Sequence, residues 1–282
     1  MDKQTRILVV AGPTASGKSA LAAWLAQRYG GLVINADSMQ VYRDLRIVTA
    51  RPDAAEEAEL PHRLYGVLSA SDPCSAGIWR RMALAEIEQA QAAGRVPVVV
   101  GGTGLYLRAL LEGIADIPPV PAAIRDEVRA RAEQMGPEAF HAELAARDPA
   151  IAERLHPTDR QRTTRAAEVL AATGRSLADW QATGVAPFPG AAAVVLVDPP
   201  VEDLRSRIDQ RFDAMVAEGA VEEVKAFLAT DPPTGAPLRR ALGVPELAAY
   251  LAGELTLDAA VTAGKAASRQ YASGSGHGFG TS

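Results

Sequence analysis

A glycine-rich loop between a strand-like stretch and a helix-like stretch is the feature that most limits how this chain can fold. An apolar, β-branched run over residues 7–11 is followed directly by Gly-Pro-Thr-Ala-Ser-Gly-Lys-Ser at positions 12–19, and a helix-like stretch from Ala20 to Tyr29 comes next. Glycines in such a loop let backbone N–H groups surround an anion, and the helix N-terminus adds partial positive charge. The spacing therefore predicts a phosphate-binding loop rather than an ordinary strand-to-helix turn.

Two side chains at the end of this loop suit phosphate chemistry. Lys18 is placed to reach a terminal phosphate, and the Ser19 hydroxyl is placed to help hold Mg²⁺. The candidate phosphate-binding residues are Gly12, Pro13, Thr14, Ala15, Ser16, Gly17, Lys18 and Ser19. The loop predicts that a polyphosphorylated molecule binds, and it leaves the reaction open.

Composition and charge narrow the class of protein. With 48% hydrophobic and 22% charged residues, the 282-residue chain has the composition of a soluble globular protein. The net charge of −5 gives no global basic field for nucleic acid. Cys74 is the single cysteine, so no intrachain disulfide can form, and the apolar run at 7–11 is too short for a signal peptide or a membrane span. We therefore expect a cytoplasmic protein.

Strand-like and helix-like segments alternate along much of the chain. Strand-like runs lie at 31–35, 63–68, 96–100 and 192–197. The clearest helix between them spans Ser75–Gly94 and repeats apolar residues on one face. This alternation implies right-handed crossovers and a mostly parallel sheet. The predicted fold class is α/β, a P-loop NTPase-like sheet flanked by helices.

A helical segment interrupts this alternation. The proline-rich stretch Ile117–Pro121 is a stiff connector, and no strand-like run follows it before residue 183. Helices are predicted at 122–135, 137–147 and 160–173. We therefore predict a helical insertion domain at 119–189, a core made of 1–118 and 190–272, and a flexible, glycine-rich tail at 273–282. The arginine-dense stretch at 160–165 is either a solvated helix face or a binding surface.

Polar residues follow two of the predicted strands. In open α/β sheets, ligands bind beyond the carboxyl ends of the strands. Asp37 follows the strand at 31–35, where it is either the cap of a turn or a base or metal partner. Gly-Gly-Thr-Gly at 101–104 ends another strand as a tight turn, in which Thr103 could offer a hydroxyl to a ligand.

Taken together, the motifs are more specific than any one of them. In chain order they are Gly-Pro-Thr-Ala-Ser-Gly-Lys-Ser at 12–19, Asp-Ser-Met-Gln-Val-Tyr at 37–42, Thr-Ala-Arg-Pro at 49–52, Pro-His at 61–62, Gly-Gly-Thr-Gly-Leu-Tyr at 101–106, Arg-Ile-Asp-Gln-Arg-Phe at 207–212, Gly-Val-Pro-Glu at 243–246 and Ser-Arg-Gln-Tyr-Ala at 268–272. This ordered set resembles the isopentenyl-tRNA transferase family, the tRNA dimethylallyltransferases, over residues 6–272.

The resemblance implies transfer of a dimethylallyl group from dimethylallyl diphosphate to N6 of the adenosine at tRNA position 37. Asp37 matches the family's general base. Thr14, Lys18, Ser19 and Arg211 match positions that contact the diphosphate or its Mg²⁺, so Asp37, Lys18 and Arg211 are the predicted catalytic residues. The positions matching family contacts with tRNA are Asp37, Ser38, Met39, Gln40, Thr103, Arg125, Gln161, Arg162, Thr163, Thr164 and Arg165. The helical insertion would grip the anticodon stem, and we expect a monomer.

One position and one terminal segment depart from the family pattern. Val48 stands where the family usually has glycine, which puts a β-branched side chain near the active-site loop. The family continues past Arg-Gln-Tyr-Ala into a basic, aromatic-bearing helix, and Ser273–Ser282 replaces it here. An altered or truncated C-terminus would give this pattern, with part of the RNA-binding surface missing.

Two other functions use the same residues. A P-loop small-molecule or nucleotide kinase would bind ATP at residues 12–19 and use Asp37 as its base. A tRNA-binding remnant would bind tRNA without useful turnover. A kinase should show saturable affinity for ATP and Mg²⁺, whereas the prenyltransferase should prefer dimethylallyl diphosphate.

Overall fold

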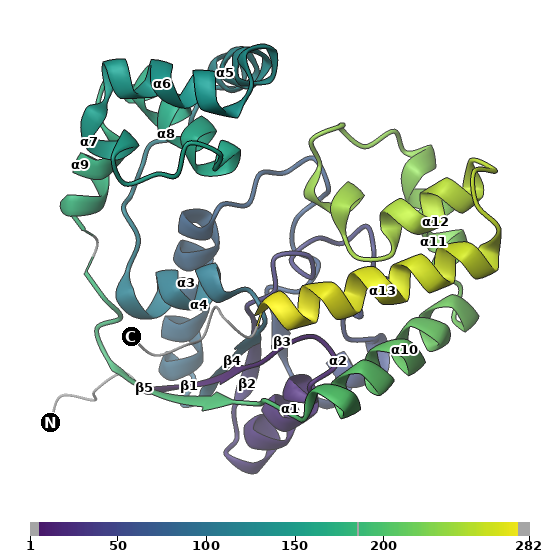
Figure 1. Cartoon of the computed structure of the whole chain (residues 1–282). Helices are drawn as coiled ribbons and strands as arrows, with labels where there is room; N and C mark the ends of the chain where they lie inside the picture. Colours follow the sequence, from purple (N-terminus) through teal and green to yellow (C-terminus); the bar gives the residue numbers. More distant parts are fainter. Residues whose placement is uncertain (1–5, 185, 276–282) are drawn as a thin grey trace, which may run out of the picture. The chain divides into compact units, whose positions relative to one another are not determined.

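A five-stranded parallel sheet lies at the centre of the larger part of the molecule. The computed structural model describes residues 6–184 and 186–275. The strands follow the order β3-β2-β4-β1-β5, and each neighbouring pair is parallel (Figure 1). Their bounds are β1 Arg6–Ala11, β2 Leu32–Asn35, β3 His62–Arg63, β4 Pro97–Gly101 and β5 Ala191–Leu196. The predicted α/β class is confirmed.

The central strands are buried because helices cover both of their faces. The adjacent residues Val9 and Val10 on β1 point to opposite faces, and both are fully buried. On the Val10 side, Ala22 and Ala26 of α1 pack against the sheet. The edge strand β5 differs, since all six of its residues are exposed. All strands point the same way, so the loops after β1, β2 and β4 meet at one edge.

The helices around the sheet follow the alternation that the sequence predicts. Their bounds are α1 Lys18–Arg28, α2 Ala54–Glu59, α3 Ala76–Ala92, α4 Gly104–Glu112, α10 Val201–Ala217, α11 Ala220–Ala229, η1 Pro237–Arg240, α12 Val244–Leu251 and α13 Leu257–Ser275. A second apolar core joins the loop after β2 to α11, η1 and α12, with Tyr42, Leu45, Phe227 and Leu247 among its members. This core fixes the loop beside the carboxyl edge of the sheet.

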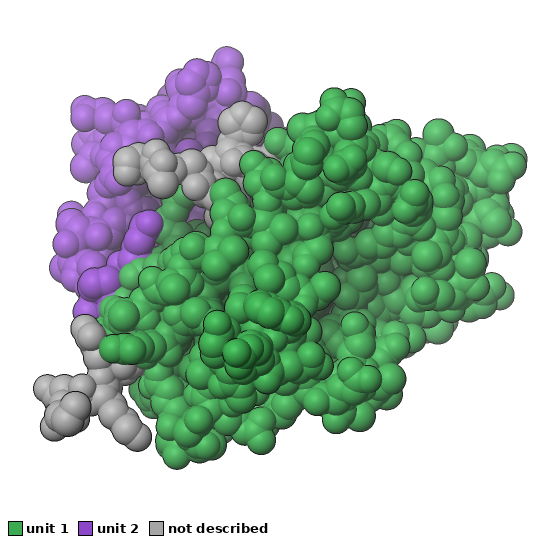
Figure 2. Space-filling model, turned by 90° about the horizontal axis from the view of Figure 1, so that it is seen from below, with its two compact units in different colours: residues 1–111, 188–282 green, residues 112–187 purple. Residues whose placement is uncertain are grey.

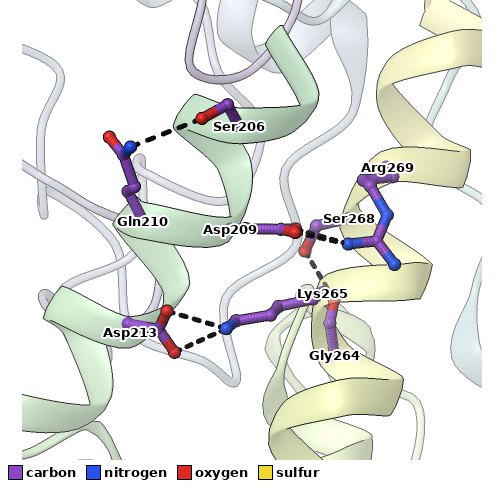
Figure 3. A network of polar contacts seen from close by, with 8 residues as sticks. All are labelled: Ser206, Asp209, Gln210, Asp213, Gly264, Lys265, Ser268 and Arg269. Carbon is purple, nitrogen blue, oxygen red and sulfur yellow. Dashed lines mark hydrogen bonds and ion pairs between the residues drawn. The ribbon is translucent and has the colours of Figure 1, made fainter. Parts of the chain in front are cut away.

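Ion pairs join α10 to α13, which run side by side (Figure 3). Arg269 donates to both oxygens of Asp209, with Nη1 to Oδ2 at 2.7 Å. Lys265 Nζ lies 2.6 Å from Asp213 Oδ1. The ring of Phe212 packs directly on Gly264, where an added Cβ would lie 2.2 Å from the ring. Glycine at this position therefore sets how closely the two helices approach.

The chain divides into two compact units, coloured separately in Figure 2. The smaller unit, Glu112–Pro187, is helical and has its own core of Leu144, Ile151 and Ala166. The buried carboxylate of Glu168 accepts a hydrogen bond from Arg129 Nε at 2.9 Å and so ties α8 to α5. The helices of this unit are α5 Ala122–Met135, α6 Pro137–Arg147, α7 Pro149–Ala152, α8 Arg160–Thr173 and α9 Leu177–Ala182.

Two predicted boundaries were wrong. The strand predicted at 63–68 is reduced to His62–Arg63, because Leu64 adopts a left-handed conformation with φ of 62°. The helix α13 continues through residues 273–275, inside the segment predicted to be a flexible tail. Residues 276–282 of that segment lie outside the described residues. Among the described residues, no helix has the length and apolar character needed to cross a membrane.

Candidate active site

The phosphate-binding loop joins β1 to α1 at the carboxyl edge of the sheet. Ala15 and Gly17 have φ values of 60° and 92°, so the backbone turns sharply just before α1. Lys18 Nζ donates to Pro13 O at 2.9 Å, so its side chain folds back over the loop. Ala15 is a non-glycine residue in the left-handed region, and it packs against Leu204 and Ile208 of α10. Packing against α10 therefore supports a strained loop conformation.

Two further features of the loop suit an anion. A Cβ on Gly12 would lie 2.5 Å from Val197 O, so only glycine fits this close approach of the backbone. The Ser16 hydroxyl is buried and has no hydrogen-bond partner in the part of the chain that the structure describes. A phosphate oxygen in the loop would supply the missing acceptor.

Asp37 is held at the end of β2 by a buried asparagine. The Asn35 carboxamide accepts from Asp37 N at 2.8 Å and donates to the carbonyls of Asp37 and Leu64, both at 3.0 Å. Asp37 Oδ1 accepts from Met39 N at 2.8 Å, whereas no hydrogen bond reaches Oδ2 from the described residues. Asp37 therefore caps a turn with one oxygen and keeps the other available for a ligand.

Thr103 joins the end of β4 to the end of β2. Its Oγ1 accepts from Ser38 N at 3.0 Å, and its own N–H donates to Ala36 O at 3.3 Å. A Cβ on the preceding Gly102 would lie 3.9 Å from Lys18 Nζ, so the glycine turn passes close to the phosphate-binding loop. The Thr103 hydroxyl thus fixes the Asp37–Gln40 segment beside that loop.

Lys18, Asp37 and Arg211 interact electrostatically at this edge. Burial lowers the pKa of Lys18 to about 8, with Asp37 opposing this shift and Arg211 adding to it. Burial also lowers the pKa of Arg211, and Asp37 again acts in the opposite direction. The Arg211 side chain has no ion pair among the described residues, because Asp209 pairs with Arg269 and Asp213 with Lys265. Two cations against one carboxylate suit a dianionic or trianionic ligand.

A small, mainly apolar pocket of about 40 Å³ adjoins Arg211 and the phosphate-binding loop. Its lining residues are Thr14, Ala15, Val48, Ile208, Arg211, Phe212, Met215, Leu242 and Ser268. Val48 is 7% exposed and forms part of this lining, so its β-branched side chain does stand near the candidate site. Arg207, which lies about one turn before Arg211 on α10, is exposed. The pocket suits a short apolar group carried on a phosphate.

The protein groups near the loop fit a magnesium ion that is bound mainly by a ligand's phosphates. Among the described residues, no group of three or more His, Cys, Asp or Glu side chains could hold a metal ion. Ser19, at the start of α1, is exposed, so its hydroxyl is accessible. Mg²⁺ usually keeps several waters and takes one or two protein oxygens together with phosphate oxygens. Ser19 can supply such an oxygen.

The remaining predicted tRNA-contact residues lie in the smaller unit. Gln161, Arg162 and Arg165 are exposed on α8, whereas Thr163 is 1% exposed and faces the core of the unit. Arg162 Nε lies 3.5 Å from Asp159 Oδ2. The other two predicted residues are the half-buried Thr164 on α8 and Arg125 on α5, whose Nη2 donates to Val120 O at 3.0 Å. The Thr163 side chain is therefore not part of the exposed arginine-rich face.

Sequence reasoning missed two residues that hold the site together. Asn35 ends an apolar strand. A polar residue at that point was the feature of the sequence that could have indicated its role. Glu223 accepts three backbone hydrogen bonds from residues 46–48. These lie more than 170 positions earlier in the chain, and no local pattern indicates this contact.

The fold and the site together define a P-loop α/β protein that binds a phosphorylated ligand at the carboxyl edge of its sheet. Residues 40–273 match the IPP transferase family, to which the chain belongs.

Similar proteins agree with this assignment. The curated tRNA dimethylallyltransferases of Nitrobacter hamburgensis and Rhodospirillum centenum are 53% and 55% identical to this chain. Each alignment covers 94% of this chain, and the two cover 84% and 85% of the respective relatives.

Two solved structures have a similar fold. A eukaryotic dimethylallyltransferase acting on tRNA has a TM-score of 0.81 and 27% identity, over 96% of this chain and 69% of its own. The tRNA isopentenylpyrophosphate transferase of Bacillus halodurans has a TM-score of 0.66 and 32% identity, over 97% of this chain and 86% of its own. These relatives favour the prenyltransferase over the kinase.

Proposed function

We propose that the protein transfers a dimethylallyl group from dimethylallyl diphosphate to N6 of the adenosine at position 37 of tRNA. The observation that carries this proposal is the convergence of Lys18, Arg211 and Asp37 at one edge of the sheet. Two cations lie where a diphosphate would leave, and a carboxylate oxygen is available where a proton would be removed. The names of the relatives supply the identity of the transferred group and of the acceptor.

The leaving group is stabilised by the loop and its two cations. When the allylic C–O bond breaks, its electron pair stays on the diphosphate oxygen, and negative charge builds up there. Backbone N–H groups of the loop, Lys18 and Arg211 stabilise that charge, which is electrostatic catalysis. Mg²⁺, held through Ser19 and the diphosphate, would neutralise further charge when bound. The small apolar pocket beside Arg211 suits the dimethylallyl group.

Asp37 completes the transfer. The N6 nitrogen forms a bond to the allylic carbon, and a proton leaves that nitrogen for the free carboxylate oxygen of Asp37. The exocyclic amine is paired or stacked in ordinary RNA, so the base must leave its stack, which costs least in a loop. The turn at Asp37–Gln40, held by Thr103, gives the extruded base a fixed surface.

The helical insertion at 119–189 binds the anticodon stem in this proposal. Exposed arginines on α8, including Arg162 and Arg165, suit phosphate contacts despite the overall negative charge. The enzyme is proposed to act as a monomer in the cytoplasm, where its tRNA substrate is made and used.

The test is incubation with unmodified tRNA, dimethylallyl diphosphate and Mg²⁺, followed by nucleoside mass analysis. We expect an adenosine that carries one added dimethylallyl group, found only at position 37. ATP should neither replace the prenyl diphosphate nor compete strongly with it. Phosphorylation of a small molecule by ATP would support the kinase instead, and tRNA binding without any product would support the remnant.

A further inference from the structure

The carboxylate of Glu223 accepts hydrogen bonds from three consecutive backbone N–H groups near the candidate site. Oε1 accepts from Arg46 N at 2.7 Å and from Ile47 N at 2.9 Å, and Oε2 accepts from Val48 N at 2.9 Å. Three consecutive backbone N–H groups that point at one centre form an anion-binding concavity. An internal carboxylate from the first turn of α11 fills it.

The loop held in this way contacts the predicted tRNA-binding turn. The carbonyls of Thr49 and Ala50 both accept from Gln40 Nε2, each at 2.9 Å. Ala50 adopts a left-handed φ of 49°, so the loop needs outside support to keep this shape. With both of its donors used, the Gln40 side chain has a defined orientation. Its backbone N–H also lies 3.4 Å from Asp37 Oδ1.

We propose that Glu223 is a positioning residue for tRNA, which acts through the loop at 46–50 on the side chain of Gln40. Its three hydrogen bonds fix the loop, the loop carbonyls fix Gln40, and Gln40 belongs to the turn that presents the base to Asp37. This role rests on the proposed function. The role adds to the proposed function a residue of α11 that is remote in sequence and touches neither substrate.

Glu223→Gln tests the role with little change in shape. The amide keeps one acceptor oxygen but turns an NH₂ group toward a backbone N–H, so at least one of the three hydrogen bonds is lost. Misplaced contact groups commonly cost up to about 100-fold in rate. We therefore expect kcat/KM for tRNA to fall about 10- to 100-fold, mainly through a higher KM. Affinity for inorganic diphosphate should stay within about twofold, because none of the hydrogen bonds described for residues 12–19 involves residues 46–50.

Glu222→Gln is the matched control. Glu222 is exposed in the same helical turn and loses the same charge on substitution, so kinetics like those of the unchanged protein are expected. A double-mutant cycle with Gln40→Ala then tests the route of the effect. If Glu223 acts through Gln40, adding Glu223→Gln to Gln40→Ala should cost no more than about twofold further. Full additivity, or equal effects of the two Glu→Gln changes, would overturn the role.

A second measurement does not depend on catalysis. Hydrogen exchange should accelerate at the amides of residues 46–48 in Glu223→Gln and stay unchanged in Glu222→Gln. Glu223→Asp, which keeps the charge on a shorter side chain, should recover part of the protection and part of the tRNA affinity. Glu223→Asp still tests the positioning role if Glu223→Gln is too unstable for kinetic measurements. Failure of the proposed function would be distinguishable, because the protein without any substitution would then fail to prenylate tRNA.

Discussion

The two carboxylate oxygens of Asp37 are placed for different tasks. One accepts from the backbone of Met39 and so fixes the turn, and the other receives no hydrogen bond from the described residues. The buried Asn35 side chain holds the backbone of Asp37 from behind. As the proposed base, Asp37 held in this way would lose little freedom on removing a proton, which favours efficient general-base catalysis.

Asp37→Asn should separate binding from chemistry. The amide can still accept from Met39 N, so the turn should persist, but no carboxylate remains to take the proton from N6. We expect the single-turnover rate to fall about 10²- to 10⁴-fold, with affinities for tRNA and dimethylallyl diphosphate little changed. Rapid-quench measurements with saturating substrates would check this. A rate within about twofold of the unchanged protein would remove Asp37 from the role of base.

Lys18 should make binding of the prenyl diphosphate dependent on pH. Burial lowers its pKa to about 8 in the free protein, so Lys18 loses its proton as the pH rises through 8. A bound diphosphate favours the charged form and raises that pKa, so binding above pH 8 must take up a proton. Affinity for dimethylallyl diphosphate should therefore weaken as the pH rises from 8 toward 10.

Calorimetric titration in buffers of different ionisation enthalpy would measure this proton uptake. Lys18→Arg is the control, because its guanidinium keeps its charge throughout the range and should remove the uptake. If the arginine variant takes up as many protons as the unchanged protein, the titrating group is not Lys18. The candidate would then lie on the ligand or on another residue of the site.

At the scale of elements, α10 and α13 are held by packing more than by their ion pairs. The pairs Asp209–Arg269 and Asp213–Lys265 are partly exposed, and such pairs typically contribute about 0–1 kcal/mol. The close contact of Phe212 with Gly264 leaves no room for a methyl group. Because Arg211 precedes Phe212 on the same helix, this contact also sets the position of a predicted catalytic cation.

Gly264→Ala should therefore destabilise the protein despite the better helix propensity of alanine. Overpacking a tight contact typically costs about 1–3 kcal/mol, against a propensity gain of about 1 kcal/mol. Gly77→Ala is the matched control, since its Cβ would meet nothing closer than Ser75 Oγ at 3.8 Å within helix α3. Urea denaturation should show a lower midpoint for Gly264→Ala and an equal or higher one for Gly77→Ala. Equal shifts in both variants would contradict the packing argument.

The elements that the sequence predicts well are those specified by local pattern. The phosphate-binding loop and the helices at 122–135, 137–147 and 160–173 are found where their spacing placed them. The strand predicted at 63–68 was wrong because one left-handed residue, Leu64, ends it early. The short helices α7 and α9 have too few residues to show a period.

The candidate site was predictable only in part for a related reason. Asp37 and Lys18 lie in short motifs that carry their chemistry locally. The residues that hold the site in place are not found in such motifs. The contacts of Thr103 with Ser38 and of Glu223 with residues 46–48 join distant parts of the chain. Nor could helical spacing tell that Arg211 would be partly buried and Arg207 exposed, because this depends on packing against segments distant in sequence, such as Thr14 and Val48.

At the scale of the whole molecule, the acidic chain must bind an anionic RNA through a local basic surface. Arg162 on α8 is suited to this, with a side chain that is 77% exposed. Arg162→Ala should weaken tRNA binding and reduce the slope of log affinity against log salt by up to about 0.9, the value for one phosphate contact. Dimethylallyl diphosphate affinity should be unchanged.

Salt titrations of tRNA binding would measure the slope. Arg147→Ala is the control, because Arg147 is an exposed arginine of the same unit outside the arginine-dense stretch. An unchanged slope for Arg162→Ala, or an equal change in both variants, would show that α8 makes no specific phosphate contact.

The pairing of β1 with β5 has a consequence for how the protein is made. Val9 is in register with Val194, so one edge of β1 stays unpaired until β5, some 180 residues later in the chain, has been synthesised. At about 5–20 residues per second, the ribosome needs on the order of 10–40 s to supply it. During that interval the nascent chain presents an open strand edge, the kind of surface that attracts chaperones and mispairing. The smaller unit is synthesised within the same interval, so the edge strand β5 joins the other four strands only after that unit has emerged.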